Sequence, residues 1–492
     1  MYWYQFLILI FERPFPTTLK SKEQIPFWLL TIGAIIVLVF SRLVKDGMFT
    51  DGVLYAAIAH NLAIGKGTFW HPYFDNYLFT FFHQQPPLTF GLQALFYKTF
   101  GDSIYVERGY SFLTVCISAL LITKIWKLIN NDNEEWKSMS WLPVFFWIIM
   151  PACFFAYSNN LEENTMGVFI LIAVLFIYKG LLKQRLGWVV LGSAFTVIAS
   201  LCKGFPGLFP IVIPIFYFIV VKPKYNPINV IVFSGMAIIV PFIIYALLLA
   251  NDTIYNSLTA YLNDRVINSI QQVSNVDTRF YLLIQLFFVQ LMPPVIITAI
   301  LLFAKGLKTV KAQFDDTTYK RNIKLFVLIG VSASFPLIVT KEQRVFYLVP
   351  SLPYYAIALS LIAVPALSIF IKKIDLKSNL YKLWVGLTSA FVVISLVVSC
   401  IGFGQAGRDK DKLHDVYAFG KMIPAGSDVN VSKDTWQDWS LHNYFVRSFN
   451  ISLDMDSAKH EYYILDRSNN ESQPAIFKTL VAKGEKYELY KR

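Results

Sequence analysis

Charged residues are scarce in this sequence. Only 15% of its 492 residues are Asp, Glu, Lys or Arg, whereas 55% are hydrophobic. Soluble domains carry roughly a quarter charged residues, so this composition excludes a water-soluble fold for most of the chain. Apolar runs of about 20 residues, enough to cross a hydrocarbon core of about 30 Å, recur from Ile25 to Ile401. The composition therefore predicts an all-α polytopic membrane protein.

Cysteine is also rare, and its positions lack the spacing of metal ligands or of a disulfide framework. The four cysteines fall in or at the ends of apolar segments and are expected to be packing residues; they are Cys116, Cys153, Cys202 and Cys400. The N-terminal segment, residues 1–11, is apolar but too short to span a membrane. Charged residues and a proline follow it where a signal peptide needs a small-residue cleavage site, so an interfacial anchor is expected.

Eleven apolar segments are expected to cross the membrane, with boundaries good to about three residues. They are residues 26–44, 105–127, 139–157, 165–182, 187–202, 207–221, 228–250, 281–303, 322–340, 345–371 and 380–401. No repeat of 20 to 50 residues is found.

The formal net charge of +12 does not indicate nucleic-acid binding, because the basic residues lie in short loops between apolar runs. If the N-terminus is cytoplasmic, every basic cluster that follows an even-numbered span is cytoplasmic, and the opposite loops hold mainly Asp and Glu. This is the positive-inside pattern. We expect an integral protein, in contact with membrane lipids, of a bacterial inner membrane.

An odd number of spans places the polar C-terminal tail outside the cytoplasm. We predict a membrane domain over residues 1–403 and a small extracytoplasmic α/β domain over 404–492. The tail has an amphipathic helical pattern around 409–423 and an alternating stretch at 460–465, which is typical of a strand. It contains no catalytic motif.

The first outer loop, residues 45–104, is too long for a connector and too apolar for a free domain. Thr50 or Asp51 can cap a helix that runs to His60 and beyond, and a second helix is expected from Leu88 to Phe100. Both are too short to span, so they are expected to lie in the plane of the membrane. Such a platform suits the arrival of a lipid headgroup, and a transporter has no evident need for it.

Two acidic positions suit the transfer of a sugar from a lipid phosphate, which needs a carboxylate near the acceptor hydroxyl. Asp51 lies beside the membrane, where desolvation raises a carboxyl pKa toward that of a useful base. Its alternative role is a helix cap. Glu163 lies in a very short outer loop that fixes its position, with Glu162 as the less favoured neighbour. The alternative for Glu163 is a solvated loop charge.

Two basic positions suit the departing phosphate. Lys203 precedes a tight outer turn, and its alternative role is snorkelling to the interface. Arg344 offers a planar fork for phosphate oxygens, with pairing to Glu342 as the competing explanation. A divalent metal on Asp51 and Glu163 is an open alternative, although the histidines of the first outer loop show no ligand spacing.

Several motifs in the same order resemble the GT-C glycosyltransferases, specifically the protein O-mannosyltransferase and lipid A aminoarabinose transferase group of glycosyltransferase family 39. The motifs together cover roughly residues 26 to 370. They are Asp51-Gly52 with Tyr55-Ala56, then Pro86-Pro87-Leu88, Phe100-Gly101 with Arg108, Leu161-Glu162-Glu163, Lys203-Gly204-Phe205-Pro206-Gly207, and Arg344 with Tyr347-Leu348-Val349-Pro350.

The resemblance implies catalytic roles for Asp51 and Glu163 and carrier-phosphate contacts for Lys203 and Arg344. It further implies that Tyr55, Gln85 and Glu162 line the substrate cleft. The sequence departs from the family at two positions. Gly52 stands where the family has a second acidic residue, and Gln85 stands where it has a basic one, so His83 is a candidate replacement for the missing cation.

These observations predict an inverting membrane glycosyltransferase. It would move a sugar from a polyprenyl-phosphate carrier to a hydroxyl of a lipid, glycan or protein acceptor on the extracytoplasmic face. The competing hypotheses are a lipid or solute transporter or flippase, which favours ionisable residues at mid-membrane and two related halves, and a purely structural assembly subunit.

Overall fold

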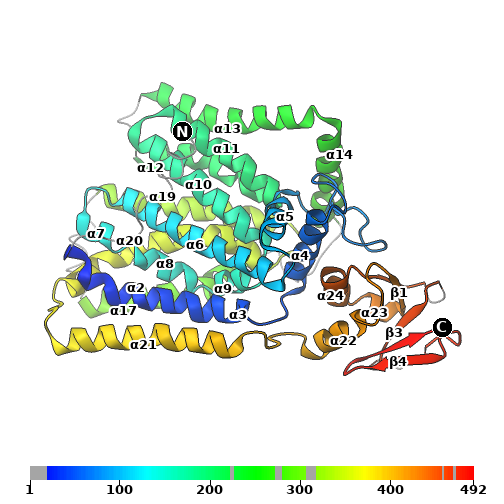
Figure 1. Ribbon diagram of the computed structural model, residues 1–492. Helices are drawn as coiled ribbons and strands as arrows, with labels where there is room; N and C mark the ends of the chain where they lie inside the picture. Colours follow the sequence, from blue (N-terminus) through cyan, green and yellow to red (C-terminus); the bar gives the residue numbers. More distant parts are fainter. Residues whose placement is uncertain (1–18, 222–225, 272–279, 306–316, 457–458, 469–472) are drawn as a thin grey trace.

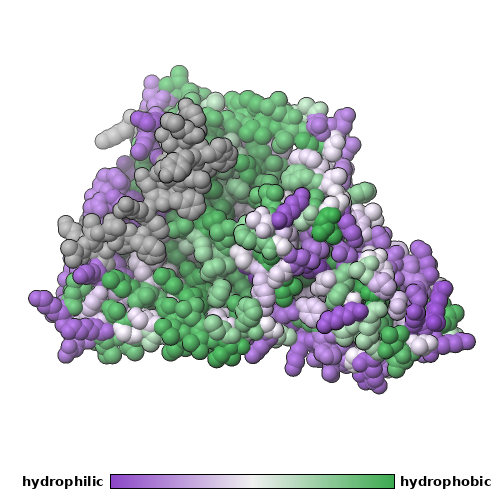
Figure 2. Space-filling view, in the orientation of Figure 1, coloured by the Kyte–Doolittle hydropathy of each residue, from purple (hydrophilic) through white to green (hydrophobic). Residues whose placement is uncertain are grey.

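The computed structural model describes residues 19–221, 226–271, 280–305, 317–456, 459–468 and 473–492. The proposed N-terminal anchor lies outside this part of the chain. Most of the described chain is helical, and Figure 1 shows long helices packed side by side with a small sheet at one end. In Figure 2 apolar side chains cover the flanks of the helices, while polar side chains gather at one margin and over the C-terminal unit. This distribution is that of a membrane protein.

Eight helices of the described residues are long and apolar enough to cross a membrane. They are Lys22–Leu43, Ile104–Ile129 (α6), Glu162–Lys183 (α10), Leu186–Lys203 (α11), Pro227–Leu249 (α13), Thr318–Val339, Val345–Ile371 and Asn379–Gly402 (α21). Lys22–Leu43 comprises the end of η1 (Leu19–Gln24), then α2 (Ile25–Ile35), η2 (Ile36–Phe40) and α3 (Ser41–Leu43). Thr318–Val339 comprises α19 (Thr317–Ser334) and η7 (Phe335–Val339), and Val345–Ile371 comprises η8 (Val345–Ser351) and α20 (Leu352–Ile371).

Two further expected spans are bent helix pairs. Trp141–Ile148 (α8) and Pro151–Ser158 (α9) meet at 78°, and Tyr281–Gln290 (α16 and η5) meets Met292–Ala304 (in α17, Met292–Lys305) at 42°. The first bend lies at Pro151, because proline disfavours helix in the residue before it and has no N–H to donate. The buried N–H of Ala152, which follows the bend, donates to Oε1 of Gln290 at 2.7 Å.

The remaining expected span, 207–221, is a shorter apolar helix, Phe205–Val221. Its first part is a 3₁₀ segment, η3 (Phe205–Val212), which carries Pro206 and Pro210 and continues as α12 (Ile213–Val221). All eleven predicted segments therefore fall on helices, but eight to ten of them qualify as spans, rather than the predicted eleven. Proline explains the difference, because it breaks helices whose composition is otherwise apolar enough.

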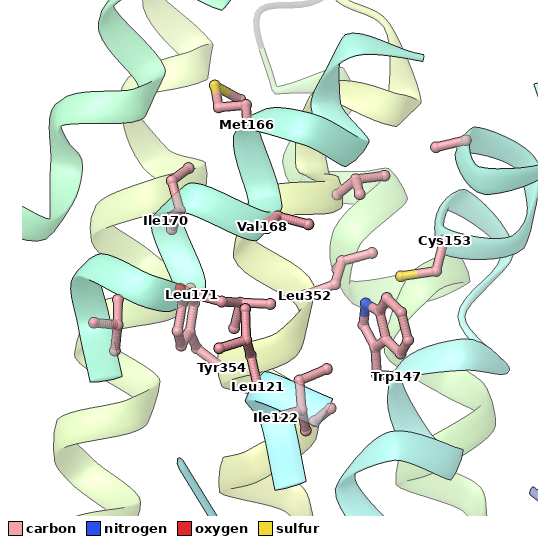
Figure 3. Packing of buried hydrophobic residues seen from close by; sticks show 14 of the residues in the cluster. Leu121, Ile122, Trp147, Cys153, Met166, Val168, Ile170, Leu171, Leu352 and Tyr354 are labelled. Carbon is pink, nitrogen blue, oxygen red and sulfur yellow. The ribbon is translucent and has the colours of Figure 1, made fainter. Parts of the chain in front are cut away.

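The core of the membrane part lies between α6, α8 to α10 and α20. Figure 3 shows Leu121, Trp147, Leu171, Leu352 and Tyr354 converging there, and all five side chains are buried. Cys153 is buried close by, as expected of a packing residue, whereas Cys116 and Cys400 are exposed. This packing fixes the helix ends that carry the candidate site.

The first outer loop forms the two short helices expected of it, α4 (Thr50–Ala63) and α5 (Leu88–Phe100). The expected capping role of Thr50 or Asp51 is wrong. Phe49 is the residue that precedes the helix, and its N–H donates to Oδ1 of Asn159 at 2.8 Å. Asp51 lies in the first turn of α4, so its carboxylate is available for another role.

The C-terminal unit is a small α/β fold, as predicted. Its helices are α22 (Lys410–Gly420), α23 (Lys433–Trp436) and α24 (Trp439–Phe449), and its strands are β1 (Asp428–Val431), β2 (Ser452–Asp454), β3 (Tyr462–Asp466), β4 (Thr479–Lys483) and β5 (Tyr487–Lys491). The strand order is β2-β1-β3-β5-β4. β1 pairs in parallel with β2 and β3, and the other pairs are antiparallel.

The stretch at 460–465 does contain a strand, β3, but not the half-exposed strand that alternation predicts. All five of its residues are buried, because it is the central strand and is covered on both faces. The domain boundary at residue 404 stays a prediction.

The remaining connections are helical. They are α7 (Glu134–Ser138) between α6 and α8, and α14 (Asp252–Tyr261), η4 (Leu262–Ile267) and α15 (Asn268–Gln271) after α13. Figure 1 places α4, α5 and α14 at the same end of the bundle as the C-terminal unit, with α7 at the opposite end.

The start of α4 packs directly against the loop before α10. A Cβ atom at Gly52 would lie 1.9 Å from the carbonyl oxygen of Asn159 and 3.0 Å from its carbonyl carbon. Both are backbone atoms of a loop that is held by its own hydrogen bonds, so they cannot move aside cheaply. Glycine is therefore required at this position.

We predict that Gly52→Ala destabilises the protein by about 1 to 3 kcal/mol, a typical cost of overpacking. Gly109→Ala is the matched control, because no heavy atom lies within 4 Å of a Cβ atom at that helical position. It should leave the thermal midpoint unchanged or raise it slightly. Midpoints of the purified proteins in detergent measure both, and equal midpoints for the two variants would contradict the prediction.

Candidate active site

A buried lysine between two glutamates forms the centre of the site. Lys203 ends α11, and its Nζ lies 3.0 Å from Oε1 of Glu163 and 3.4 Å from Oε2 of Glu162. Both glutamates are fully buried in the first turn of α10, and Lys203 is 8% exposed. The expected alternatives, snorkelling for the lysine and a solvated loop charge for Glu163, are therefore wrong.

Aromatic rings complete the surroundings of the ammonium group. Its Nζ lies 5.7 Å from the ring centroid of Tyr55, 6.0 Å from that of Phe346 and 5.5 Å from that of Tyr347. These are distances at which a cation is attracted to a ring face. The lysine is thus held by two carboxylates and three rings, so that its charge has a fixed position.

The turn after Lys203 needs its glycine. Gly204 has φ +90°, and a Cβ atom there would lie 1.8 Å from the hydroxyl of Tyr261. Tyr261 ends α14, so the close contact brings the segment after α13 down onto the end of α11. This places α14 and η4 at the site.

Arg265 is a candidate site residue that the sequence pattern did not indicate. It lies in η4, where its Nη1 is 2.7 Å from Oε2 of Glu342 and its Nη2 donates to the hydroxyl of Tyr347 at 3.1 Å. Burial disfavours the charge of Arg265, but Tyr347 and Glu342 outweigh that effect, and the pKa of Arg265 is raised. The available signal was a lone arginine in a polar outer segment, which is too common a pattern to single out.

A cavity of about 920 Å³ lies beside these charged groups. Its walls are mostly apolar side chains of η3, α12, α19 and η7, such as Phe209, Phe216 and Leu337. Its polar lining includes Gln85, Glu163, Lys203, Arg265 and Tyr347. A mostly apolar chamber with two fixed cations has the chemistry of a site for a lipid phosphate.

A second cavity of about 730 Å³ lies against the other face of the 344–347 segment. Phe49, Phe155 and Phe346 line it, together with Arg42 and Arg344. Arg344 therefore borders a different cavity from Lys203. Its Nε is 3.9 Å from Oε1 of Glu342, a long contact, and half of its side chain is exposed.

Asp51 interacts electrostatically with the cations of both cavities, Lys203 and Arg265 of the first and Arg344 of the second. Burial raises the pKa of the Asp51 carboxyl above its usual range, while Lys203, Arg344 and Arg265, in that order, act to lower it. Among the residues that the structure describes, none forms a hydrogen bond with this carboxylate. It is thus a half-buried and unengaged acid, which is the state expected of a general base before substrate binds.

The structure brings together Asp51, Tyr55, Glu162, Glu163 and Lys203, and it places Gln85 on the wall of the first cavity. His83 is not among the lining residues of either cavity. Its Nε2 lies 3.1 Å from Nδ1 of His71, and burial lowers the pKa of His83. A neutral imidazole in that pair is a poor replacement for a missing cation.

Metal ligation by Asp51 and Glu163 stays a prediction. Oε1 of Glu162 and Oε2 of Glu163 are buried without a hydrogen-bond partner among the described residues, whereas Oε1 of Glu163 pairs with Lys203. Within that part of the chain, however, no three His, Cys, Asp or Glu residues are grouped as a metal site requires.

One protein family matches part of the sequence. Residues 84–250 match the family model described as dolichyl-phosphate-mannose-protein mannosyltransferase, a segment that contains Glu162, Glu163 and Lys203 but not Asp51. No curated protein matches the sequence significantly.

Crystal structures of ArnT from Cupriavidus metallidurans share the fold. The apo state has a TM-score of 0.61 and the form bound to undecaprenyl phosphate 0.59; each is 14% identical and is matched over 94% of this chain and 97% of its own. A third structure is that of the oligosaccharyltransferase AglB from Archaeoglobus fulgidus in complex with an inhibitory peptide and a dolichol-phosphate. Its TM-score is 0.50 at 12% identity, and the match covers 89% of this chain and 69% of AglB. Residues 84–250 are therefore similar to the protein mannosyltransferase family, and the chain as a whole shares the fold of ArnT.

Proposed function

We propose that this protein transfers a sugar from a polyprenyl-phosphate carrier to an acceptor hydroxyl on the extracytoplasmic side of the membrane, with inversion at the anomeric carbon. The observation that carries the proposal is the apolar cavity whose polar lining holds Lys203, Arg265 and Tyr347. A polyprenyl chain needs such apolar walls, and its phosphate needs fixed positive charge at one place.

The carrier phosphate binds between Lys203 and Arg265 in this proposal. The hydroxyl of Tyr347 already accepts a hydrogen bond from Arg265, and the Tyr347 ring faces Lys203, so the two cations flank one aromatic side chain. Arg265 retains N–H groups for phosphate, since its side chain is 27% exposed. Arg265 is a better candidate than His83 to replace the basic residue that the family has at the position of Gln85.

Asp51 acts as the general base. It accepts the proton of the acceptor hydroxyl while that oxygen attacks the anomeric carbon, and the bond from this carbon to the phosphate oxygen breaks. The electron pair of that bond leaves with the polyprenyl phosphate, whose charge Lys203 and Arg265 stabilise. Glu162 and Glu163 hold Lys203 in place, and their unpartnered oxygens can accept hydrogen bonds from the hydroxyl groups of the sugar.

The acceptor approaches Asp51 from the second cavity. Phe49, two residues before Asp51, lines that cavity, and Arg344 both lines it and acts on the Asp51 carboxyl. With the carrier in one cavity and the acceptor in the other, the attacking oxygen and the leaving phosphate lie on opposite sides of the anomeric carbon. This is the geometry that inversion requires. Arg344 then contacts the acceptor more readily than the carrier phosphate.

A transporter is the less favoured function. The buried charges lie at the ends of α10 and α11 and in the outer helices, not at the middle of the spans. The shared fold is also that of glycosyltransferases.

We predict that Asp51→Asn lowers the transfer rate about 10²- to 10⁴-fold, because the amide cannot accept the proton. The measurement is transfer of radiolabelled sugar from a polyprenyl-phosphate donor in proteoliposomes. Asp252→Asn is the control, since this exposed acid lies at the start of α14 away from both cavities. Full activity of Asp51→Asn would contradict its role as the base.

Carrier binding gives a second prediction that does not depend on the identity of the sugar. Undecaprenyl phosphate should raise the thermal midpoint of the wild-type protein, because a ligand stabilises the state that binds it. Arg265→Gln should weaken the apparent affinity about 10- to 100-fold through loss of a charge-assisted hydrogen bond. Arg42→Gln, in the second cavity, should bind like wild type. Equal losses in the two variants would argue against the assigned carrier cavity.

The pH dependence of transfer gives a third prediction. Activity needs the charged form of Asp51, so the rate falls as the pH drops through the pKa of that carboxyl. Arg344 favours the carboxylate, and Arg344→Gln should therefore raise the pKa and move the acidic limb of the kcat profile to higher pH. Arg42→Gln should leave the limb in place. A limb that moves to lower pH in Arg344→Gln would be inconsistent with Asp51 as the titrating group.

A further inference from the structure

We propose that helix α24 of the C-terminal unit positions Asp51 for catalysis through Asn443. This inference rests on the proposed role of Asp51 as the base. The polar tail holds no catalytic motif of its own, and the role proposed here is exerted through the backbone that carries the aspartate.

Asn443 binds Thr50, the residue immediately before Asp51. The side chain is fully buried, and its Nδ2 donates to the carbonyl oxygen of Thr50 at 2.9 Å and to the Thr50 hydroxyl at 3.0 Å. Oδ1 of Asn443 is buried without a hydrogen-bond partner among the described residues. An unsatisfied buried acceptor costs about 1 to 3 kcal/mol, so a residue selected for packing alone would not be an amide.

Tyr444 adds a second contact from the same helix. Its hydroxyl accepts from the N–H of Met48 at 3.3 Å and lies 3.2 Å from the Met48 carbonyl oxygen. Its other neighbour is Oδ2 of Asp409, at 3.0 Å, within the C-terminal unit. The backbone of residues 48 and 50 is therefore bound to α24 at both positions.

The opposite side of the same segment is bound to the loop before α10. Oδ1 of Asn159 accepts from the N–H of Phe49 at 2.8 Å, and Nδ2 of Asn160 donates to the carbonyl oxygen of Gly52 at 3.4 Å. This loop leads directly into Glu162 and Glu163. Residues 48–52 are thus clamped between α24 on one side and the element that carries the glutamates on the other.

The clamp determines where the carboxylate of Asp51 lies. Since that carboxylate forms no hydrogen bond within the described part of the chain, its position depends on the backbone that carries it. An error of about 1 Å in the position of a reacting group can cost about 10²-fold in rate. Loss of the Asn443 contacts should therefore reduce turnover more than it reduces binding of the carrier.

The test compares Asn443→Leu with Arg447→Met. Leucine keeps the volume of the asparagine without its hydrogen bonds. Arg447 lies on the same buried face of α24. It pairs with Asp102 before α6 and with Glu107 in the first turn of α6, and within the described residues it forms no hydrogen bond or ion pair with residues 48–52. Arg447→Met thus measures the effect of loosening the C-terminal unit as a whole.

We expect Asn443→Leu to lower kcat about 10- to 100-fold while undecaprenyl phosphate raises its thermal midpoint as in wild type. Arg447→Met should lose thermal stability yet keep kcat within about twofold below its midpoint. Retention of kcat by Asn443→Leu, or an equal loss of kcat in both variants, would overturn the proposal.

A readout independent of activity separates this proposal from the proposed function. In an Asp51→Cys background, the labelling rate of residue 51 by a water-soluble thiol reagent, followed by peptide mass spectrometry, should rise at least about tenfold on adding Asn443→Leu and stay unchanged on adding Arg447→Met. An unchanged rate with Asn443→Leu overturns the positioning role. Absence of transfer by wild type, with the labelling result as expected, would instead overturn only the proposed function.

Discussion

The buried contact of Lys203 with Glu162 and Glu163 is the constraint on which the rest of the site depends. Removing charged groups from water is costly, and a buried ion pair offsets that cost only where its geometry is good. The two glutamates begin α10 and the lysine ends α11, so the packing of these adjacent helices places the three groups together. Loss of one partner would leave an uncompensated buried charge. The structure keeps these charges where the proposed chemistry needs them rather than where stability alone would place them.

The two cavities are lined by neighbouring residues of one segment, and the cations that act on the proposed catalytic base line both of them. Tyr347 faces the first cavity and Phe346 the second, because they are neighbours in the 3₁₀ segment η8. A two-substrate reaction needs this separation, since the carrier and the acceptor must reach one point from different directions. The cations are divided in the same way, with Lys203 and Arg265 on one side and Arg344 on the other. Each cavity therefore has its own means of recognising an anionic group.

The C-terminal unit is part of the same arrangement rather than an appendage. Arg447, Asn443 and Tyr444 contact α4 and the turn after α5 from one face of α24. Contacts between residues 48–50 and 443–444 join segments almost 400 positions apart in the chain. No local pattern indicates such a contact, because asparagine and tyrosine on an amphipathic helix are ordinary surface residues. Only the docking of the helix buries them.

The sequence by itself determined the class of protein, the approximate position of every membrane helix, the two short helices of the first outer loop and a site built around Asp51, Glu163 and Lys203. These features depend on composition, periodicity and residue order, which are local properties of the chain. Tertiary structure alone decided that Glu162 shares the lysine, that Arg265 joins the site while His83 stays apart, that Arg344 borders a second cavity and that Gly52 is required by Asn159. Each of these four features depends on which segments, far apart in the sequence, come close in space. That proximity is set by the packing of the helices and by the prolines that bend them.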